Sequence, residues 1–306
     1  MRGAAAGLIA RGDPDTAARQ LDLDQTVWSP DAPTFNPPYL TGKVSERTTL
    51  EAMITHSDNT ATDMALKLAG PDNVRAFIAS IGLRSTMIPD STRILFGYLL
   101  GATNYKTFTW ADLVAAANDP IVNSPLNAVE TMASTADDLV AYYSRSLQGA
   151  YFTYPATLSQ FREILAMGGA IWLVPLPLGV SAFAKGGSID VPGFHAVCIP
   201  GGMFFDNRWV FFCLTINWYA PAQTDPDTVS AFLAAASRAL TVVKDALSSN
   251  GGQYGGPAGN EPQAAVHGGR RPGRPRSRAG KTAGAAAFRP AAAEAHGGLR
   301  NEGQLT

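Results

Sequence analysis

The chain is poor in cysteine, in charged residues and in long apolar runs. Its 306 residues include two cysteines, Cys198 and Cys213, too few for a disulfide framework and too far apart in sequence for a typical metal site. We expect both to be buried free thiols. Only 16% of the residues are charged and the net charge is −1, so we expect neither a nucleic acid nor a membrane as a partner. No apolar run approaches the roughly 18 residues of a membrane helix.

The first half of the sequence has the periodicity and the end signals of helices. Residues 48–57 and 60–70 carry apolar residues at helical spacing, and the second run stops at Gly70. Pro71 opens a third helix, and Ser134 is the expected N-cap of a fourth that stops at Gly149. We therefore expect residues 50–170 to be mostly helical, with long connections.

The pattern changes to that of strands near residue 179. Three runs, 179–190, 194–205 and 208–220, are rich in β-branched and aromatic residues, and Asp206-Asn207 is a plausible hairpin turn between the last two. Residues 225–249 follow as a long amphipathic helix suited to one face of the sheet. Helices followed by an antiparallel sheet and a helix indicate an α+β fold with two lobes.

The C-terminal segment differs in composition from the rest. Residues 249–306 consist largely of Gly, Pro, Ala and Arg, with too little apolar area to offset the entropy of ordering. We predict a folded domain over residues 1–248 and a disordered tail over 249–306. The "RRPGRPRSR" stretch is basic, but such patterns are permissive and we expect no nucleic-acid binding from it.

Two short motifs carry the chemical signal. Ser57-Asp58-Asn59 lies at the start of a predicted helix, where three small polar residues are also what N-capping favours. "KGGS", Lys185–Ser188, lies well downstream on the first predicted strand. A helical lobe carrying S-D-N and a strand carrying K-[TS]-G are the pair expected of active-site serine penicillin-interacting enzymes.

With these motifs the chain resembles the class A β-lactamase family, or more broadly the β-lactamase and D,D-peptidase-like serine hydrolases, over residues 4–248. The resemblance implies a β-lactamase/transpeptidase-like fold and acyl transfer through a serine ester, without metal or cofactor. It implies catalytic roles for Ser57 as a proton relay, for Asn59 in orienting the substrate amide and for Lys185 near the substrate carboxylate. Gly187 would let the substrate approach, and the Ser188 N–H would form half of an oxyanion hole.

The nucleophile motif of that family, S-x-x-K, is absent from the sequence. The residues three positions before the six lysines are Leu, Met, Thr, Ala, Thr and Arg. Residues 4–11 look like the tail of the helix that S-x-x-K begins, so we expect the motif, with a further helix and two strands, to precede Met1. The start would then be misplaced, or the gene would be a remnant. As written, we expect the chain to be catalytically inactive and poorly stable.

A second departure concerns the family's Ω-loop, in which E-x-x-L-N supplies the base for deacylation. The nearest match is "NSPLN", with Asn123 in the position of Glu, and an amide predicts slow turnover of the acyl-enzyme. Glu130 is the nearest carboxylate but lies outside the pattern.

Other interpretations remain open: a D,D-peptidase-like acyl-transfer enzyme, a non-catalytic remnant or binding module, or a two-lobed domain with a capped helix and no site. We expect His56 and His195 to be structural. The expected partner is a small β-lactam or a peptidoglycan-like amide, bound by a monomer. The family works in the periplasm or as secreted proteins; because we do not interpret the opening residues as a signal peptide, we expect this chain as written to stay in the cytoplasm.

Overall fold

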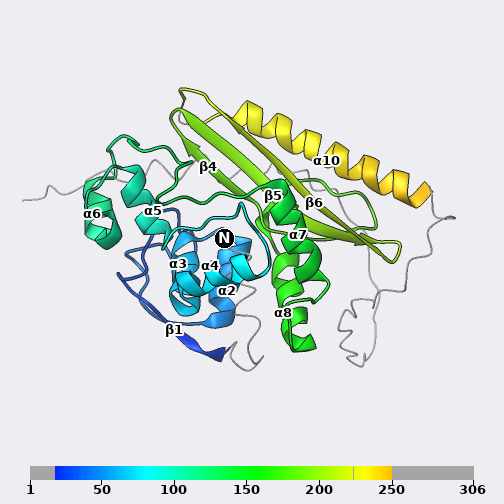
Figure 1. The fold of residues 1–306 in the computed structure, drawn as a ribbon, viewed down its shortest axis with the longest axis horizontal. Coiled ribbons are helices and arrows are strands. Elements are labelled where there is room, and N and C mark those ends of the chain that lie inside the picture. The colour runs from blue at the N-terminus through cyan, green and yellow to red at the C-terminus, as the bar shows by residue number, and fades with distance from the viewer. Residues whose placement is uncertain (1–17, 223, 250–306) are drawn as a thin grey trace, which may run out of the picture. The chain divides into compact units, whose positions relative to one another are not determined.

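The computed structural model describes residues 18–222 and 224–249. The predicted helix tail at residues 4–11 and, apart from Ser249, the predicted disordered tail at residues 249–306 lie outside this range. The described part starts with a two-stranded antiparallel pair, β1 and β2, continues through helices α2 to α9, and finishes with the main sheet and helix α10 (Figure 1). The β1–β2 pair was not expected from the sequence.

The helical part contains eight α-helices, α2 to α9, and one 3-10 helix within the described residues. The bounds, with those of the β1–β2 pair, are β1 Gln20–Leu23, β2 Gly42–Ser45, α2 Glu46–Thr55, α3 Asn59–Ala69, α4 Pro71–Ser80, α5 Thr92–Leu99, η2 Tyr105–Thr107, α6 Trp110–Ala115, α7 Ala136–Leu147, α8 Pro155–Ala166 and α9 Gly169–Leu173.

Side-chain caps explain where several of these helices begin. Asp58 caps α3 by accepting the backbone N–H of Ala61, and Pro71 stands at the start of α4. The prediction that Ser134 caps α7 is wrong by one residue. The cap is Thr135, whose hydroxyl accepts the Asp138 N–H, because Asp138 occupies the third position of the helix.

The main sheet confirms the three predicted antiparallel runs, with one interruption. The strands are β3 Ser181–Ala184, β4 Gly187–Val191, β5 Phe194–Phe205 and β6 Arg208–Trp218. β5 is central: β3 and β4 both pair with one of its edges, and β6 pairs with the other along eleven residue pairs. Asp206 and Asn207 both have positive φ, 47° and 56°, as the two-residue hairpin turn requires.

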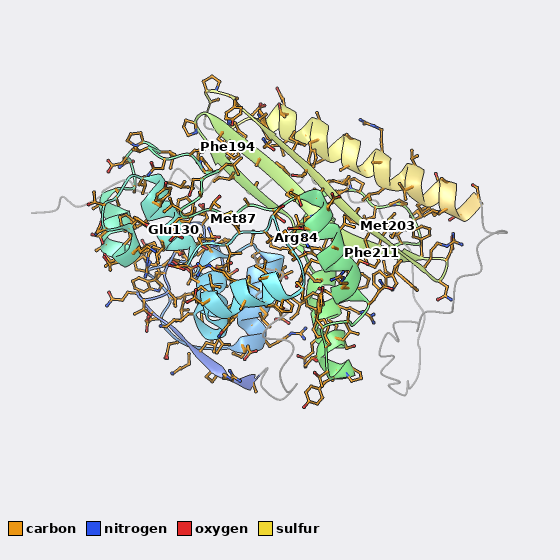
Figure 2. The ribbon with its side chains drawn as sticks, viewed as in Figure 1. Arg84, Met87, Glu130, Phe194, Met203 and Phe211 are labelled. Atoms are coloured by element: carbon orange, nitrogen blue, oxygen red, sulfur yellow. The ribbon has the colours of Figure 1, made fainter. Side chains whose placement is uncertain are left out.

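The two faces of the sheet pack against different helices. Met203 belongs to a cluster with Ala236 and Leu240 of α10, which spans Pro226–Ser249, whereas Phe211 packs on the core of the helical part. Both side chains are labelled in Figure 2. The alternation arises because successive side chains of a strand point to opposite faces. The fold is therefore α+β, with the sheet between α10 and the helical part, as predicted.

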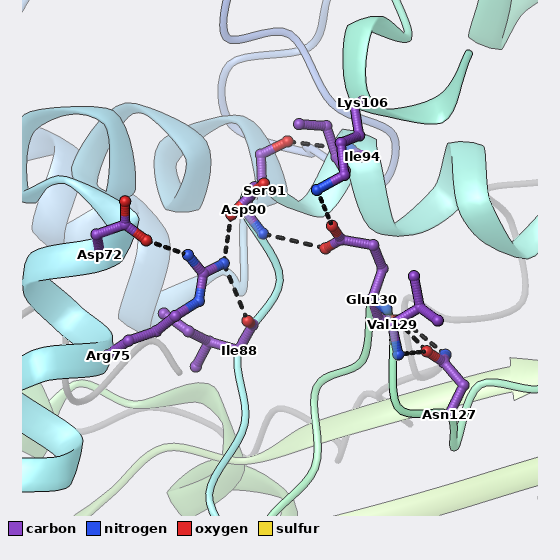
Figure 3. A network of polar contacts seen from close by, with 10 residues as sticks. All are labelled: Asp72, Arg75, Ile88, Asp90, Ser91, Ile94, Lys106, Asn127, Val129 and Glu130. Atoms are coloured by element: carbon purple, nitrogen blue, oxygen red, sulfur yellow. Dashed lines mark hydrogen bonds and ion pairs between the residues drawn. The ribbon is translucent and has the colours of Figure 1, made fainter. Parts of the chain in front are cut away.

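The segment between Asp90 and Glu130, called the insertion below, contains α5, η2 and α6 (Figure 1), and Figure 3 shows the polar contacts at its two ends. At its base Met87 and Ala133 form an isolated β-bridge. Glu130, which is buried, accepts the Asp90 N–H at 3.3 Å, and Arg75 binds the Asp90 carboxylate. These contacts hold the two ends of the insertion next to each other, so that the segment from 91 to 129 leaves and rejoins the rest of the protein at one place.

Candidate active site

Ser57 lies in the three-residue connection between α2 and α3, with its backbone in the left-handed region at φ 60°. This conformation costs a non-glycine residue about 1–3 kcal/mol, so the surrounding structure must hold it. Asp58 supplies that hold. Its carboxylate is fully buried and accepts three backbone N–H groups, from Ala61 at 2.7 Å and from Thr34 and Phe35 at 2.9 Å each. Asp58 thus ties the connection to the loop that precedes β2.

Lys185 comes to Ser57 from the main sheet. It lies between β3 and β4, 8% exposed, and its Nζ donates to the Ser57 Oγ at 2.9 Å and to the Gly186 carbonyl. The two residues are 128 positions apart in sequence. The structure therefore brings the Ser of S-D-N and the Lys of K-G-G into direct contact.

Pro200 explains why the strand is interrupted at Lys185. Ala184 pairs with Gly201 and Gly187 pairs with Cys198, so the same register continues through the gap and places Lys185 opposite Pro200. The Lys185 N–H donates to the Pro200 carbonyl at 3.3 Å, but proline has no N–H to return to the Lys185 carbonyl. Of the two backbone hydrogen bonds that an antiparallel pair would form between Lys185 and Pro200, only one is therefore possible.

The position of Gly186 explains the loose match to K-[TS]-G. A Cβ at Gly186 would lie 2.6 Å from the Cβ of Ala170 in α9, far inside van der Waals contact. A serine or threonine cannot stand here without moving α9. A Cβ at Gly187, in contrast, would meet nothing within 4 Å.

Gly187 and Ser188 lie on the exposed edge of the sheet, in β4. Backbone N–H groups alternate along an antiparallel strand. Because the Lys185 N–H points to β5, that of Ser188 points away from β5. The Ser188 N–H, the predicted oxyanion donor, thus points away from the sheet, on the same edge strand that follows Lys185.

Asn59 is the first residue of α3 and is 7% exposed. Its side-chain amide donates to the Pro30 carbonyl at 2.8 Å, and its backbone N–H donates to the Asp31 carbonyl. The loop before β2 therefore holds Asn59 as well as Asp58.

Asp63 was missed by the sequence analysis. Its carboxyl group is buried and accepts the Ser29 hydroxyl at 2.5 Å and the N–H groups of Thr92 and Arg93 at 2.7 Å and 3.2 Å. Burial raises its pKa, which these hydrogen bonds only partly oppose. The signal was available: Asp63 lies four positions after Asn59, on the same face of a helix. Its effect is to fix the start of α5, and so of the insertion, on the helix that carries Asn59.

Asn123 lies elsewhere. Its amide donates to the Tyr98 carbonyl at 2.7 Å and its backbone N–H to the Leu99 carbonyl, so it is attached to the C-terminal end of α5. Glu130 contacts the Asp90 N–H and lies 3.9 Å from the Lys106 Nζ, and burial raises its pKa (Figure 3). The residues of the insertion that α3 holds are Thr92 and Arg93, not the "NSPLN" segment.

His56 is exposed, and His195 is buried on the α10 face of the sheet. Within residues 18–222 and 224–249, no group of three or more His, Cys, Asp or Glu side chains could hold a metal ion. In the same part of the chain, no helix combines the length and the apolar character needed to cross a bilayer.

The fold is that of the β-lactamase and transpeptidase-like proteins. A class A beta-lactamase from Bacteroides cellulosilyticus superposes with a TM-score of 0.58 at 17% identity, covering 81% of this chain and 82% of that one. TLA-3 extended-spectrum beta-lactamase gives 0.57 at 15% identity, with 79% and 82% covered. A mutant of PBP-A, in an acyl-enzyme complex with penicillin G, gives 0.56 at 17% identity, with 80% of each chain covered.

Residues 15–166 match the model of the beta-lactamase enzyme family, and with this match the chain belongs to that family. The comparison with curated proteins gave no match.

Proposed function

We propose that the protein is a β-lactamase-type serine hydrolase whose Ser57, Asn59 and Lys185 form the proton-relay and substrate-orienting half of an acyl-transfer site. The observation that carries the proposal is the hydrogen bond between Lys185 Nζ and Ser57 Oγ. A hydroxyl can donate and accept at once, so a serine held by an ammonium group can pass a proton to the leaving nitrogen of a β-lactam.

The remaining roles follow from the same geometry. Lys185 attracts the carboxylate that penicillins carry, and the outward N–H of Ser188 stabilises negative charge on the carbonyl oxygen during attack. Gly187 leaves the space above the strand open for the substrate. Asn59 orients the substrate amide from the start of α3. Asp58 and Asp63 act by positioning: Asp58 holds the backbone around Ser57, and Asp63 holds the start of α5.

The 306 residues contain no S-x-x-K, so we propose that this chain binds a β-lactam without forming an acyl-enzyme. Proteins of this family typically work in the periplasm or as secreted proteins, and we further propose that this one acts as a monomer.

Binding and acylation can be tested separately on the full chain with penicillin G. We expect saturable binding by isothermal titration calorimetry and no mass increase by intact-mass spectrometry. Lys185→Ala should weaken binding by about 10-fold or more, as expected for the loss of a charged contact worth about 1.5–3 kcal/mol. Lys67→Ala is the matched control, because Lys67 also binds a hydroxyl, that of Thr26 at 2.8 Å, but on an exposed surface.

An acyl adduct on any residue would refute the proposed inactivity. Absence of binding, or equal binding by Lys185→Ala and the wild-type chain, would refute the proposed site and favour a remnant that keeps the two motifs only as structure.

A further inference from the structure

The two cysteines meet on one face of the main sheet. Cys198 of β5 pairs with Thr215 of β6, and Pro200 pairs with Cys213, so the cysteines are diagonal neighbours on adjacent strands. Residues two apart on a strand, and their cross-strand partners, share a face. The two Sγ atoms lie 3.7 Å apart, and both thiols are free and half-buried rather than buried as predicted.

The face that carries the thiols also carries Lys185. Lys185 stands opposite Pro200, and Gly187 stands opposite Cys198 on the other side of β5. Because Gly187 has no side chain and the place of its Cβ is open, the row from Gly187 to Cys198 is uncovered on the β4 side. A small molecule at the β4 edge therefore has a route toward the Cys198 sulfur.

The two thiols differ in pKa. The hydrogen bond between the two sulfurs lowers the pKa of Cys198 to about 7 and raises the pKa of Cys213. Near neutral pH a large part of Cys198 is therefore thiolate while Cys213 retains its proton, which makes Cys198 the nucleophile.

We propose that Cys198 and Cys213 form a redox-active dithiol beside the candidate active site, which low-molecular-weight disulfides modify. The Cys198 thiolate attacks one sulfur of the oxidant, forms a mixed disulfide and expels a thiolate, which takes the proton of Cys213. The Cys213 sulfur then attacks the Cys198 sulfur and expels the second thiolate. The two protein sulfurs lose two electrons, and the oxidant becomes one small thiol, which carries the Cys213 proton, and one thiolate, which solvent protonates. The sulfurs must approach by roughly 1.7 Å to reach bonding distance.

Oxidised glutathione is the probe, used on the full folded chain with intact-mass spectrometry after trapping with iodoacetamide. The wild-type chain should lose about 2 Da and both alkylatable thiols, as closure of an internal disulfide requires. Cys213→Ser should stop at a single glutathione adduct on Cys198. Cys198→Ser should gain its adduct at least about 10-fold more slowly, because the remaining thiol keeps its proton. Circular dichroism checks that both variants are folded.

Three results would overturn the proposal: a wild-type chain that accumulates two glutathione adducts, one that forms a disulfide-linked dimer, or one whose native thiols stay unreacted while the urea-unfolded chain reacts. Equal rates for the two single-cysteine variants would also overturn it, since Cys198 would then not be the attacking sulfur.

Discussion

Gly186 offers a sharp test of how the candidate site is packed. In Gly186→Ala the new Cβ would lie 2.6 Å from the Cβ of Ala170, about 1 Å inside the separation at which carbon atoms attract. Overpacking of this size costs about 1–3 kcal/mol, against a gain of about 0.4–1 kcal/mol from a less flexible unfolded chain. We expect a net loss of about 1–2 kcal/mol in the free energy of unfolding.

Gly187→Ala is the matched control, since it makes the same change one residue away with nothing within 4 Å. It should be neutral or slightly stabilising, by up to about 1 kcal/mol. Urea denaturation monitored by tryptophan fluorescence measures both variants. Combining Gly186→Ala with Ala170→Gly should restore most of the loss, with a coupling energy of about 1 kcal/mol or more. If Gly186→Ala is as stable as Gly187→Ala, the argument that α9 excludes Ser or Thr from K-[TS]-G is wrong.

Two further predictions concern other buried groups. Asp58→Ala removes the acceptor of three backbone N–H groups and should lower the free energy of unfolding by about 2–4 kcal/mol, measured by urea denaturation. Asp72→Ala is the control, because Asp72 is an exposed acid, and it should change stability little. A loss below about 1 kcal/mol for Asp58→Ala would contradict the prediction. For His195, burial lowers the pKa, but its hydrogen bonds to Asp190 and the Ala220 carbonyl and the charges of Asp190 and Asp225 outweigh it, so the pKa is raised. The stabilisation from His195 should therefore be complete below about pH 6.5, the unfolded-state pKa, and fade as pH rises through the folded-state pKa. Urea denaturation of wild type and His195→Gln from pH 5.5 to 9 should show the wild-type advantage shrinking with pH; a constant difference would count against the charged state.

Much of the fold followed from local signals in the sequence. The Asp206-Asn207 turn, the Pro71 start of α4 and the long α10 each depend on residues close together in the chain, and each is confirmed. The β1–β2 pair was not expected, and the helices of the insertion were covered only by the general expectation that residues 50–170 are mostly helical. β1 and β2 have only four residues each and lie 19 residues apart, too short for a periodic pattern to stand out.

In the candidate site, too, the sequence predicted what depends on local motifs and not what depends on contacts between distant residues. The motifs indicated Ser57, Asn59 and Lys185 by residue type and order. The place of Asn123 depends on its contacts with the Tyr98 and Leu99 carbonyls at the end of α5, which the short E-x-x-L-N pattern does not contain. Asp63 makes contacts 29 and 34 residues away, which only the folded chain reveals.

Pro200 links these observations. A proline is unusual in the middle strand of a sheet, because it removes a ladder hydrogen bond. Here the lost bond is the one to the Lys185 carbonyl, and Lys185 is the residue whose side chain must leave the sheet to reach Ser57. The next residue, Gly186, is packed against α9, and the one after it, Gly187, is open. Over three successive residues, the strand therefore lacks a backbone hydrogen bond at Lys185, is tightly packed at Gly186 and is open at Gly187. Such a sequence of changes is hard to explain by the needs of a sheet alone, and it is consistent with a strand shaped to present Lys185 and the Ser188 N–H to a ligand.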